Sequence, residues 1–163
     1  MTQYDLVIIG SGPGGRAAAI QAGKLKRRVL VIDRKDRFGG VSVHTGTIPS
    51  KTLRETVLNL SGWRERSFYG RSYRVKDEIG ADDLKMRLHK TLDYEVDVLE
   101  HQFNRNHVDT MSGLARFISP HEVEVTADNG EVTTVSAAHV LIATGTYTYR
   151  PDSVPFNGTS ILD

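Results

Sequence analysis

The chain has 163 residues and no cysteine, and its 21 lysines and arginines nearly balance its 20 aspartates and glutamates. A chain of this length is typical of one domain with a real hydrophobic core. The balanced charge gives no support for binding to nucleic acid or to an anionic membrane. The lack of cysteine excludes disulfides, thiolate nucleophiles and cysteine metal ligands.

No apolar run approaches the roughly 20 residues that span a bilayer, so we expect no membrane partner. The N-terminus leads directly into an apolar stretch that contains Asp5, which is unlike a signal or transit peptide. We therefore expect a cytoplasmic protein. The histidines show no shared spacing with acidic residues, so we expect no metal site.

The first predicted unit begins with an apolar run, residues 6–9, that ends in the pattern Gly10-x-Gly12-x-x-Gly15. Small residues follow, and a second apolar run ends on Asp33. This strand, turn, helix and strand are typical of a dinucleotide-binding unit. The helix N-terminus would face the phosphates, and Asp33 would accept hydrogen bonds from a ribose. The alternative is the same unit without a ligand, which leaves the third glycine and the acid unexplained.

The next elements are less regular. The pattern predicts a helix over 13–27, a glycine-rich loop over 36–49, and a helix from 51 to 63 with Ser50 as its N-cap. Apolar residues at three- and four-residue steps then predict a long amphipathic helix over 81–106. We expect its apolar face to contact the core or a partner helix, and we consider self-association through it.

From residue 108 the hydrophobic period becomes that of strands. Strands are expected over 108–118, 121–128 and 132–145, with a hairpin turn at Asp128-Asn129-Gly130. The predicted fold class is therefore α/β: a Rossmann-like, mostly parallel sheet with flanking helices. A small antiparallel excursion over 117–136 would precede the strand at 139–143.

A second glycine-rich segment, GGVSVHTGTIPSK, spans residues 39–51. Its two leading glycines would let the backbone lie against a flat or charged ligand. The hydroxyls of Thr45, Thr47 and Ser50 and the amine of Lys51 place donors at the start of a helix. They would contact the far end of a long dinucleotide, whereas the alternative is an ordinary loop with a solvated lysine.

Four motifs follow one another in the chain: GSGPGG, GGVSVHTGTIPSKTLRE, GLARF and VLIATGT. In this order they resemble the pyridine nucleotide–disulfide oxidoreductases, the glutathione-reductase-like flavoproteins that include dihydrolipoamide dehydrogenase. The resemblance covers nearly the whole chain and corresponds to the N-terminal part of that class. It implies that residues 1–163 form an FAD-binding domain, with FAD as cofactor and NAD(P) as substrate.

The resemblance also assigns residues to parts of the cofactor. The pyrophosphate turn would comprise Gly10, Gly12, Pro13, Gly14 and Gly15. The adenosine ribose would lie at Asp33, and Arg34 would be a further cofactor-binding residue. The pyrophosphate, ribityl chain and flavin ring would lie near Gly39, Gly40, Val41, Ser42, Thr45, Gly46 and Lys51. The adenine edge would lie near Gly113, Leu114 and Ala115, and the closing strand end would be Ala143, Thr144 and Gly145. Lys51 is the residue that we expect to tune the charge of the flavin and to act in catalysis.

The class usually carries two cysteines in its second motif, at the positions of Ser42 and Thr47 here. A dithiol relay from flavin to a disulfide substrate is therefore excluded, and with it reduction of lipoamide or glutathione disulfide. The segments TGTIPSKTLRE and YGRSYRVKD favour similarity to the soluble pyridine nucleotide transhydrogenases, in which flavin passes a hydride from NADPH to NAD. Ser42 and Tyr147 depart from the pattern of that subgroup.

Members of this class are much longer than 163 residues. We expect the second nucleotide-binding unit, a return strand with an aspartate for the ribityl chain, and the dimerisation domain with its catalytic histidine to be absent. One hypothesis is an FAD-dependent transhydrogenase, or its FAD-binding part. The others are a flavin-binding module without turnover of its own, a dihydrolipoamide-dehydrogenase-like flavoprotein that has lost its disulfide, and an NAD site at the first motif.

Overall fold

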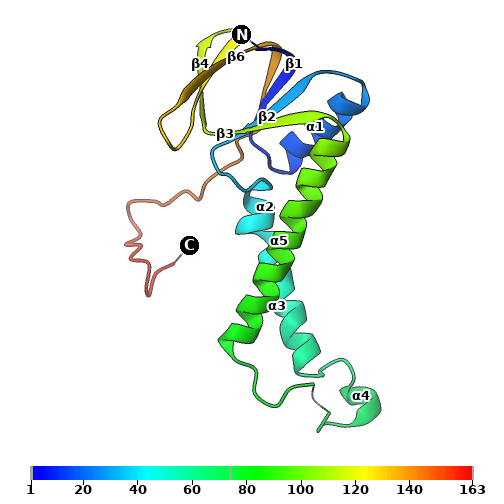
Figure 1. Ribbon diagram of the computed structural model, residues 1–163. Coiled ribbons are helices and arrows are strands. Elements are labelled where there is room, and N and C mark those ends of the chain that lie inside the picture. The colour runs from blue at the N-terminus through cyan, green and yellow to red at the C-terminus, as the bar shows by residue number, and fades with distance from the viewer. Residues whose placement is uncertain (1, 74, 163) are drawn as a thin grey trace.

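The computed structural model describes residues 2–73 and 75–162 (Figure 1). Its strands are β1 (Thr2–Ile9), β2 (Val29–Asp33), β3 (Val108–Ser112), β4 (Leu114–Ser119), β5 (Glu122–Thr126) and β6 (Val132–Ile142). Its helices are α1 (Pro13–Lys24), α2 (Gly40–His44), α3 (Thr47–Leu60), α4 (Arg66–Tyr69) and α5 (Ala81–Arg105). Among these described residues, no helix is long and apolar enough to cross a membrane, and no group of three or more histidines or acids is placed to hold a metal ion.

The six strands form one sheet in the order β3-β2-β1-β6-β5-β4. Strands β3, β2, β1 and β6 run parallel, whereas β4, β5 and β6 are antiparallel. Within the parallel part, β2 lies between β1 and β3, and its apolar residues 29–32 are buried, as is typical of an inner parallel strand. The structure confirms an α/β fold with a mostly parallel sheet and an antiparallel excursion.

Alternation along the strands divides the core between the two faces of the parallel sheet. Val7, Leu30 and Ile32 pack with Val123, Val125, Val135 and Ala137 of β5 and β6. Ile8, Val29 and Val31 point to the other face, where they pack with Ala19 of α1 and Phe103 of α5. The antiparallel strands therefore cover one face and the helices cover the other.

The predicted strand over 108–118 is wrong, because Gly113 divides it into β3 and β4. Gly113 has φ +151°, and its N–H donates to the Asp33 carbonyl oxygen at 2.8 Å. The two strands that it joins lie at opposite edges of the sheet. The antiparallel part therefore begins at Leu114 rather than at residue 117, and β6 is one strand that pairs with β5 and then with β1.

Further helix boundaries also differ from those predicted, and one of them is the end of α3, at Leu60 rather than at residue 63. Helix α1 ends at Lys24 rather than at residue 27, because Lys26 adopts a positive φ of 59°. Helix α3 begins at Thr47, so Ser50 is not an N-cap; its hydroxyl donates to the Gly46 carbonyl oxygen at 3.1 Å. Pro49 stands in the first helical turn, where a missing N–H costs no hydrogen bond.

Helices α3 and α5 lie side by side and extend away from the sheet, with α4 at the far end (Figure 1). The predicted bounds of α5 agree with the structure to within one residue at its C-terminus. Its Val96 and Leu99 pack on Val43 of α2, which confirms that part of its apolar face contacts the core. Self-association through this helix stays a prediction; Met86 and Tyr94 are its exposed large apolar side chains.

Asp83 fixes the start of α5. Its carboxylate accepts hydrogen bonds from Lys76 Nζ at 2.6 Å and from the Gly80 N–H at 3.0 Å, and these bonds lower its pKa below the ordinary aspartate range. Folding then favours the charged form, so the stabilisation is present above the ordinary pKa and is lost as pH falls through the lowered one. We expect Asp83→Asn to melt below the wild type at neutral pH. The two melting temperatures should converge in strong acid, and a constant difference would contradict this role.

Candidate functional site

The first glycine turn lies at the carboxyl end of β1, next to the end of β6. The Gly10 N–H donates to the Ile32 carbonyl oxygen at 2.7 Å. Gly10 has φ +108°, and a Cβ there would lie 2.3 Å from the Ala143 carbonyl oxygen. The first and fourth motifs therefore pack directly against each other. This is the point where β1 has β2 on one side and β6 on the other, the usual place for a ligand in an open α/β sheet.

The turn leads into α1 with backbone donors free. Gly12 is the N-cap residue, no side chain caps the helix, and Pro13 is the first helical residue. A Cβ added to Gly12 or to Gly14 meets nothing within 4 Å, whereas one on Gly15 would lie 2.0 Å from the Gly10 carbonyl oxygen. Gly15 therefore serves packing, and Gly12 faces open space. The unpaired N–H groups of the first turn and the helix dipole make this space suited to an anion.

Asp33 ends β2 beside this turn, as the sequence predicts, but its carboxylate already has partners within the chain. Oδ2 accepts hydrogen bonds from the Ser11 N–H at 2.8 Å and from the Ser11 hydroxyl. Oδ1 accepts one from the Lys35 N–H at 3.2 Å. The acid is thus oriented by the glycine turn before any ligand arrives.

The second glycine segment packs against the first. Gly39 and Gly40 have φ values of +125° and +62°, and a Cβ on Gly40 would lie 2.8 Å from Gly12 Cα. Contrary to the predicted loop over 36–49, the chain then forms α2 and starts α3. The reason is burial: Val43, which is 2% exposed, holds α2 against α5. Ser42 lies in α2, where its hydroxyl donates to the Gly39 carbonyl oxygen at 3.2 Å.

The third and fourth motifs lie at the same carboxyl ends of the parallel strands. Gly113 is tied to the Asp33 carbonyl oxygen, so the third motif touches the end of β2. The Ala143 N–H donates to the Ile9 carbonyl oxygen at 2.8 Å, and β6 ends one residue before it, at Ile142. All four motifs therefore meet at one edge. We call the backbone around Gly10, Gly12, Gly40, Asp33 and Ala143 the glycine cradle.

The other predicted residues lie outside the backbone that defines this cradle. Ala115 packs on the core beneath it, and Gly46 links α2 to α3. The exposed members are Arg34, Val41, Thr45, Lys51, Leu114, Thr144 and Gly145. Lys51 lies in the second turn of α3, and its side-chain amine forms no ion pair with the residues that the structure describes.

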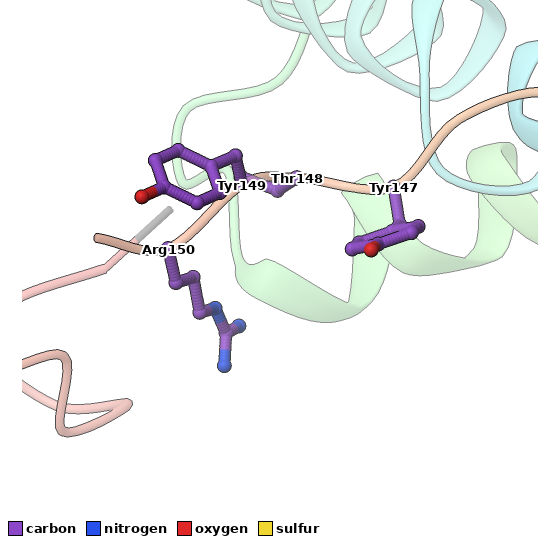
Figure 2. A pocket seen from close by; sticks show the side chains of 4 residues that line it. All are labelled: Tyr147, Thr148, Tyr149 and Arg150. Atoms are coloured by element: carbon purple, nitrogen blue, oxygen red, sulfur yellow. The ribbon is translucent and has the colours of Figure 1, made fainter. Parts of the chain in front are cut away.

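An open hollow lies elsewhere, on the segment after Gly145. It is lined by Tyr147, Thr148, Tyr149 and Arg150. Figure 2 shows that the tyrosine and arginine side chains leave an extended segment in different directions, and the Arg150 guanidinium stacks 5.7 Å from the Phe156 ring centroid. No set of polar groups converges on this hollow, so it offers a poorer ligand site than the glycine cradle.

Sequence reasoning missed two features of the cradle. Ser11 is buried at 1% exposure between the glycine turn and β2, and the only signal for it was a hydroxyl between two glycines. Gly39 packs on Val43 and on Leu99 of α5, which a Cβ would meet at 2.6 Å and 3.1 Å. The contact between Gly39 and Leu99 joins residues 60 positions apart, so no local pattern predicts it.

The comparisons with known proteins agree with this architecture. A family model described as pyridine nucleotide-disulphide oxidoreductase matches residues 4–161. A soluble pyridine nucleotide transhydrogenase of Mycobacterium bovis is 49% identical over the whole chain, which covers 35% of that relative. One of Azotobacter vinelandii is 37% identical over 98% of the chain, which covers 34% of it.

A solved structure, the HOCl-induced flavoprotein disulfide reductase RclA of Escherichia coli in complex with Cu(II), shares the fold. Its TM-score is 0.74 at 24% identity, over 93% of this chain and 31% of that one. The chain thus spans about a third of the length of the curated relatives it matches. The match over residues 4–161 establishes that the chain belongs to the pyridine nucleotide–disulphide oxidoreductase family.

Proposed function

We propose that this chain is the FAD-binding part of a flavin-dependent NAD(P) transhydrogenase. The observation that carries the proposal is the glycine cradle, where four motifs from distant parts of the sequence meet at the carboxyl edge of the parallel strands. Gly12 lines it with bare backbone, Gly40 packs directly on Gly12, and α1 directs its uncapped N-terminus into it. This combination suits the pyrophosphate of a dinucleotide.

FAD is the cofactor that family membership implies, and the residues of the cradle fit it. The first turn of α1 would bind the pyrophosphate through N–H groups, and Asp33 would accept a hydrogen bond from the adenosine ribose. The backbone of Gly39 and Gly40 would lie along the rest of the molecule. When bound, FAD supplies a flavin that accepts a hydride from one nicotinamide and returns it to another. The chain's own task is to bind, orient and shield the cofactor.

The transhydrogenase proposal rests on the second motif and on the relatives. Ser42 and Thr47 stand where a redox disulfide would need two thiols, so this motif cannot relay electrons to a disulfide. The relatives that align with all or nearly all of the chain are named as soluble pyridine nucleotide transhydrogenases. We propose for this protein the substrates that we expect of such enzymes, NADPH and NAD. Because these names include the word soluble, we also propose a cytoplasmic location.

A visible absorption spectrum tests this proposal. Purified protein saturated with FAD should be yellow after removal of free cofactor, and NADPH should bleach the flavin band under anaerobic conditions. Protein that stays colourless contradicts the assignment of FAD. If the flavin binds but NADPH does not bleach it, the result contradicts hydride transfer by this chain alone.

A flavin-binding module without turnover of its own is the second candidate. Within residues 1–163, one strand–turn–helix unit carries the full glycine pattern, and we assign that unit to FAD. No second unit for NADPH is evident among the described residues. This candidate predicts a stable FAD complex that neither NADH nor NADPH bleaches.

Lys51 provides a variant-based prediction within the proposed function. Because it is exposed and unpaired, Lys51→Met should change the free energy of unfolding by less than about 0.5 kcal/mol. If its charge lies near the flavin ring, the variant should still bind FAD, and its flavin should have a lower midpoint potential than that of the wild type. Potentiometric titration of both proteins measures this, and equal potentials would remove Lys51 from the site.

A further inference from the structure

We propose that Ser11 is a positioning residue for FAD: its buried hydroxyl fixes the Asp33 carboxylate and the second glycine segment in the conformation that receives the cofactor. This inference rests on the proposed function. Ser11 is one of two buried polar residues in the part of the chain that the structure describes, the other being Thr56. Its neighbours Gly10 and Gly12 both line the cradle.

Three segments meet at this one side chain. The Ser11 hydroxyl donates to Asp33 Oδ2 at the end of β2, and its oxygen accepts the Gly39 N–H at 2.9 Å. The Ser11 N–H donates to the same carboxylate oxygen. The hydroxyl donates one hydrogen bond and accepts another, so the turn, the acid and the second glycine segment are held as one unit.

These bonds also determine which part of Asp33 faces a ligand. A carboxylate offers about four lone-pair positions, two on each oxygen. The two bonds from Ser11 occupy Oδ2, and the Lys35 N–H occupies one position on Oδ1. Oδ1 alone keeps a free position, so Ser11 leaves that oxygen to accept a ribose hydroxyl.

Removing the hydroxyl separates this role from simple stability. In Ser11→Ala, the buried Gly39 N–H loses its acceptor. Asp33 Oδ2 also loses the hydroxyl donor, so the Asp33 carboxylate can rotate. Hydrogen bonds to charged groups are among the stronger ones in proteins. We therefore expect the dissociation constants of FAD and of ADP, a probe for the adenosine half, to rise at least about tenfold.

Thr56 provides a matched control, because it also carries a buried hydroxyl with a short hydrogen bond. Its Oγ1 donates to the Thr52 carbonyl oxygen at 2.7 Å within α3, and nothing connects it to Asp33. Thr56→Val preserves shape and removes this bond. Both variants should melt below the wild type, but only Ser11→Ala should lose affinity for FAD and ADP.

A double-mutant cycle shows whether Ser11 acts through the acid. In an Asp33→Asn background, adding Ser11→Ala should change the ADP dissociation constant by no more than about twofold. Calorimetric titration of FAD and ADP into all variants provides the data. The positioning role is overturned if Ser11→Ala binds ADP as the wild type does, if Thr56→Val loses as much affinity, or if the two effects in the cycle add fully.

The same titrations distinguish this inference from the proposed function. A folded wild type that binds neither FAD nor ADP contradicts the FAD assignment, and the positioning role falls with it. A wild type that binds both, together with a Ser11→Ala variant of equal affinity, contradicts the role of Ser11 alone.

Discussion

Replacement of Gly12 by alanine should abolish tight FAD binding while it leaves the fold intact. The backbone of Gly12 has φ −63° and ψ −178°, which alanine adopts without strain. An added Cβ meets no atom of the chain within 4 Å, so it projects into the space that the proposed pyrophosphate needs. We expect a loss of affinity of about a hundredfold, which corresponds to a few kcal/mol of overpacking.

The stability of the same variant is its internal control. Alanine restricts the unfolded chain more than glycine does, and it caps a helix slightly less well. These effects oppose each other, so the apoprotein should melt within about 3 °C of the wild type. Parallel calorimetry with FAD and thermal melting without FAD measure the two quantities. Wild-type affinity in Gly12→Ala would show that the pyrophosphate does not lie over this residue.

Replacement of Gly15 by alanine should have the opposite signature, a large loss of stability before any ligand is added. The new Cβ would lie 2.0 Å from the Gly10 carbonyl oxygen, and this neighbour is backbone that cannot rotate away. Either α1 moves off β1 or the glycine turn distorts, at a cost of about 3 kcal/mol. For a chain of this size, the melting temperature should fall by roughly 10 °C.

Gly14 offers the matched control for this second prediction. It precedes Gly15 in the same helical turn, and a Cβ there meets nothing within 4 Å. Since alanine is a better helix former than glycine, Gly14→Ala should melt at or slightly above the wild-type temperature. Equal melting temperatures for the Gly14→Ala and Gly15→Ala apoproteins would contradict the close approach of α1 to the end of β1.

The first βαβ unit could be predicted from the sequence because each local signal agrees there. The apolar runs, the glycine spacing and Asp33 all predict one arrangement. The structure places Gly10, Gly15 and Asp33 together at the carboxyl ends of β1 and β2. The long helix α5 was also predictable, since its apolar residues keep one helical period over many turns. In both regions the hydrophobic residues recur with a regular period, which makes the elements predictable.

Local rules failed where tertiary contacts decide. Gly39 and Pro49 are typical of loops, yet the burial of Val43 against α5 makes a short helix between them. The residues on both sides of Gly113 favour strands equally. No local sequence pattern shows that β3 and β4 become the two opposite edge strands of the sheet. Ser11 belongs to the same category, because its partners lie 22 and 28 positions away.

Neither the sequence pattern nor the fold assigns a role to the exposed candidate residues. Val41 and Thr144 were identified through the family resemblance, whereas Thr45 and Lys51 also follow from the hydrogen-bond donors of the second glycine-rich segment. In the structure all four residues are exposed. Their assignments therefore remain proposals that depend on where the flavin ring lies. The residues that define the cradle are partly buried and are held by contacts within the chain. The open space beside Gly12 and the uncapped N-terminus of α1 carry the argument for a dinucleotide.

Calorimetric titration of FAD into the folded wild-type chain tests the central claim most directly, because that claim is binding of FAD by the glycine cradle. We predict saturable heat with one FAD per chain and a dissociation constant that rises steeply in Gly12→Ala. A well-folded chain that gives no heat with FAD, or that binds it equally well after Gly12→Ala, would contradict the account.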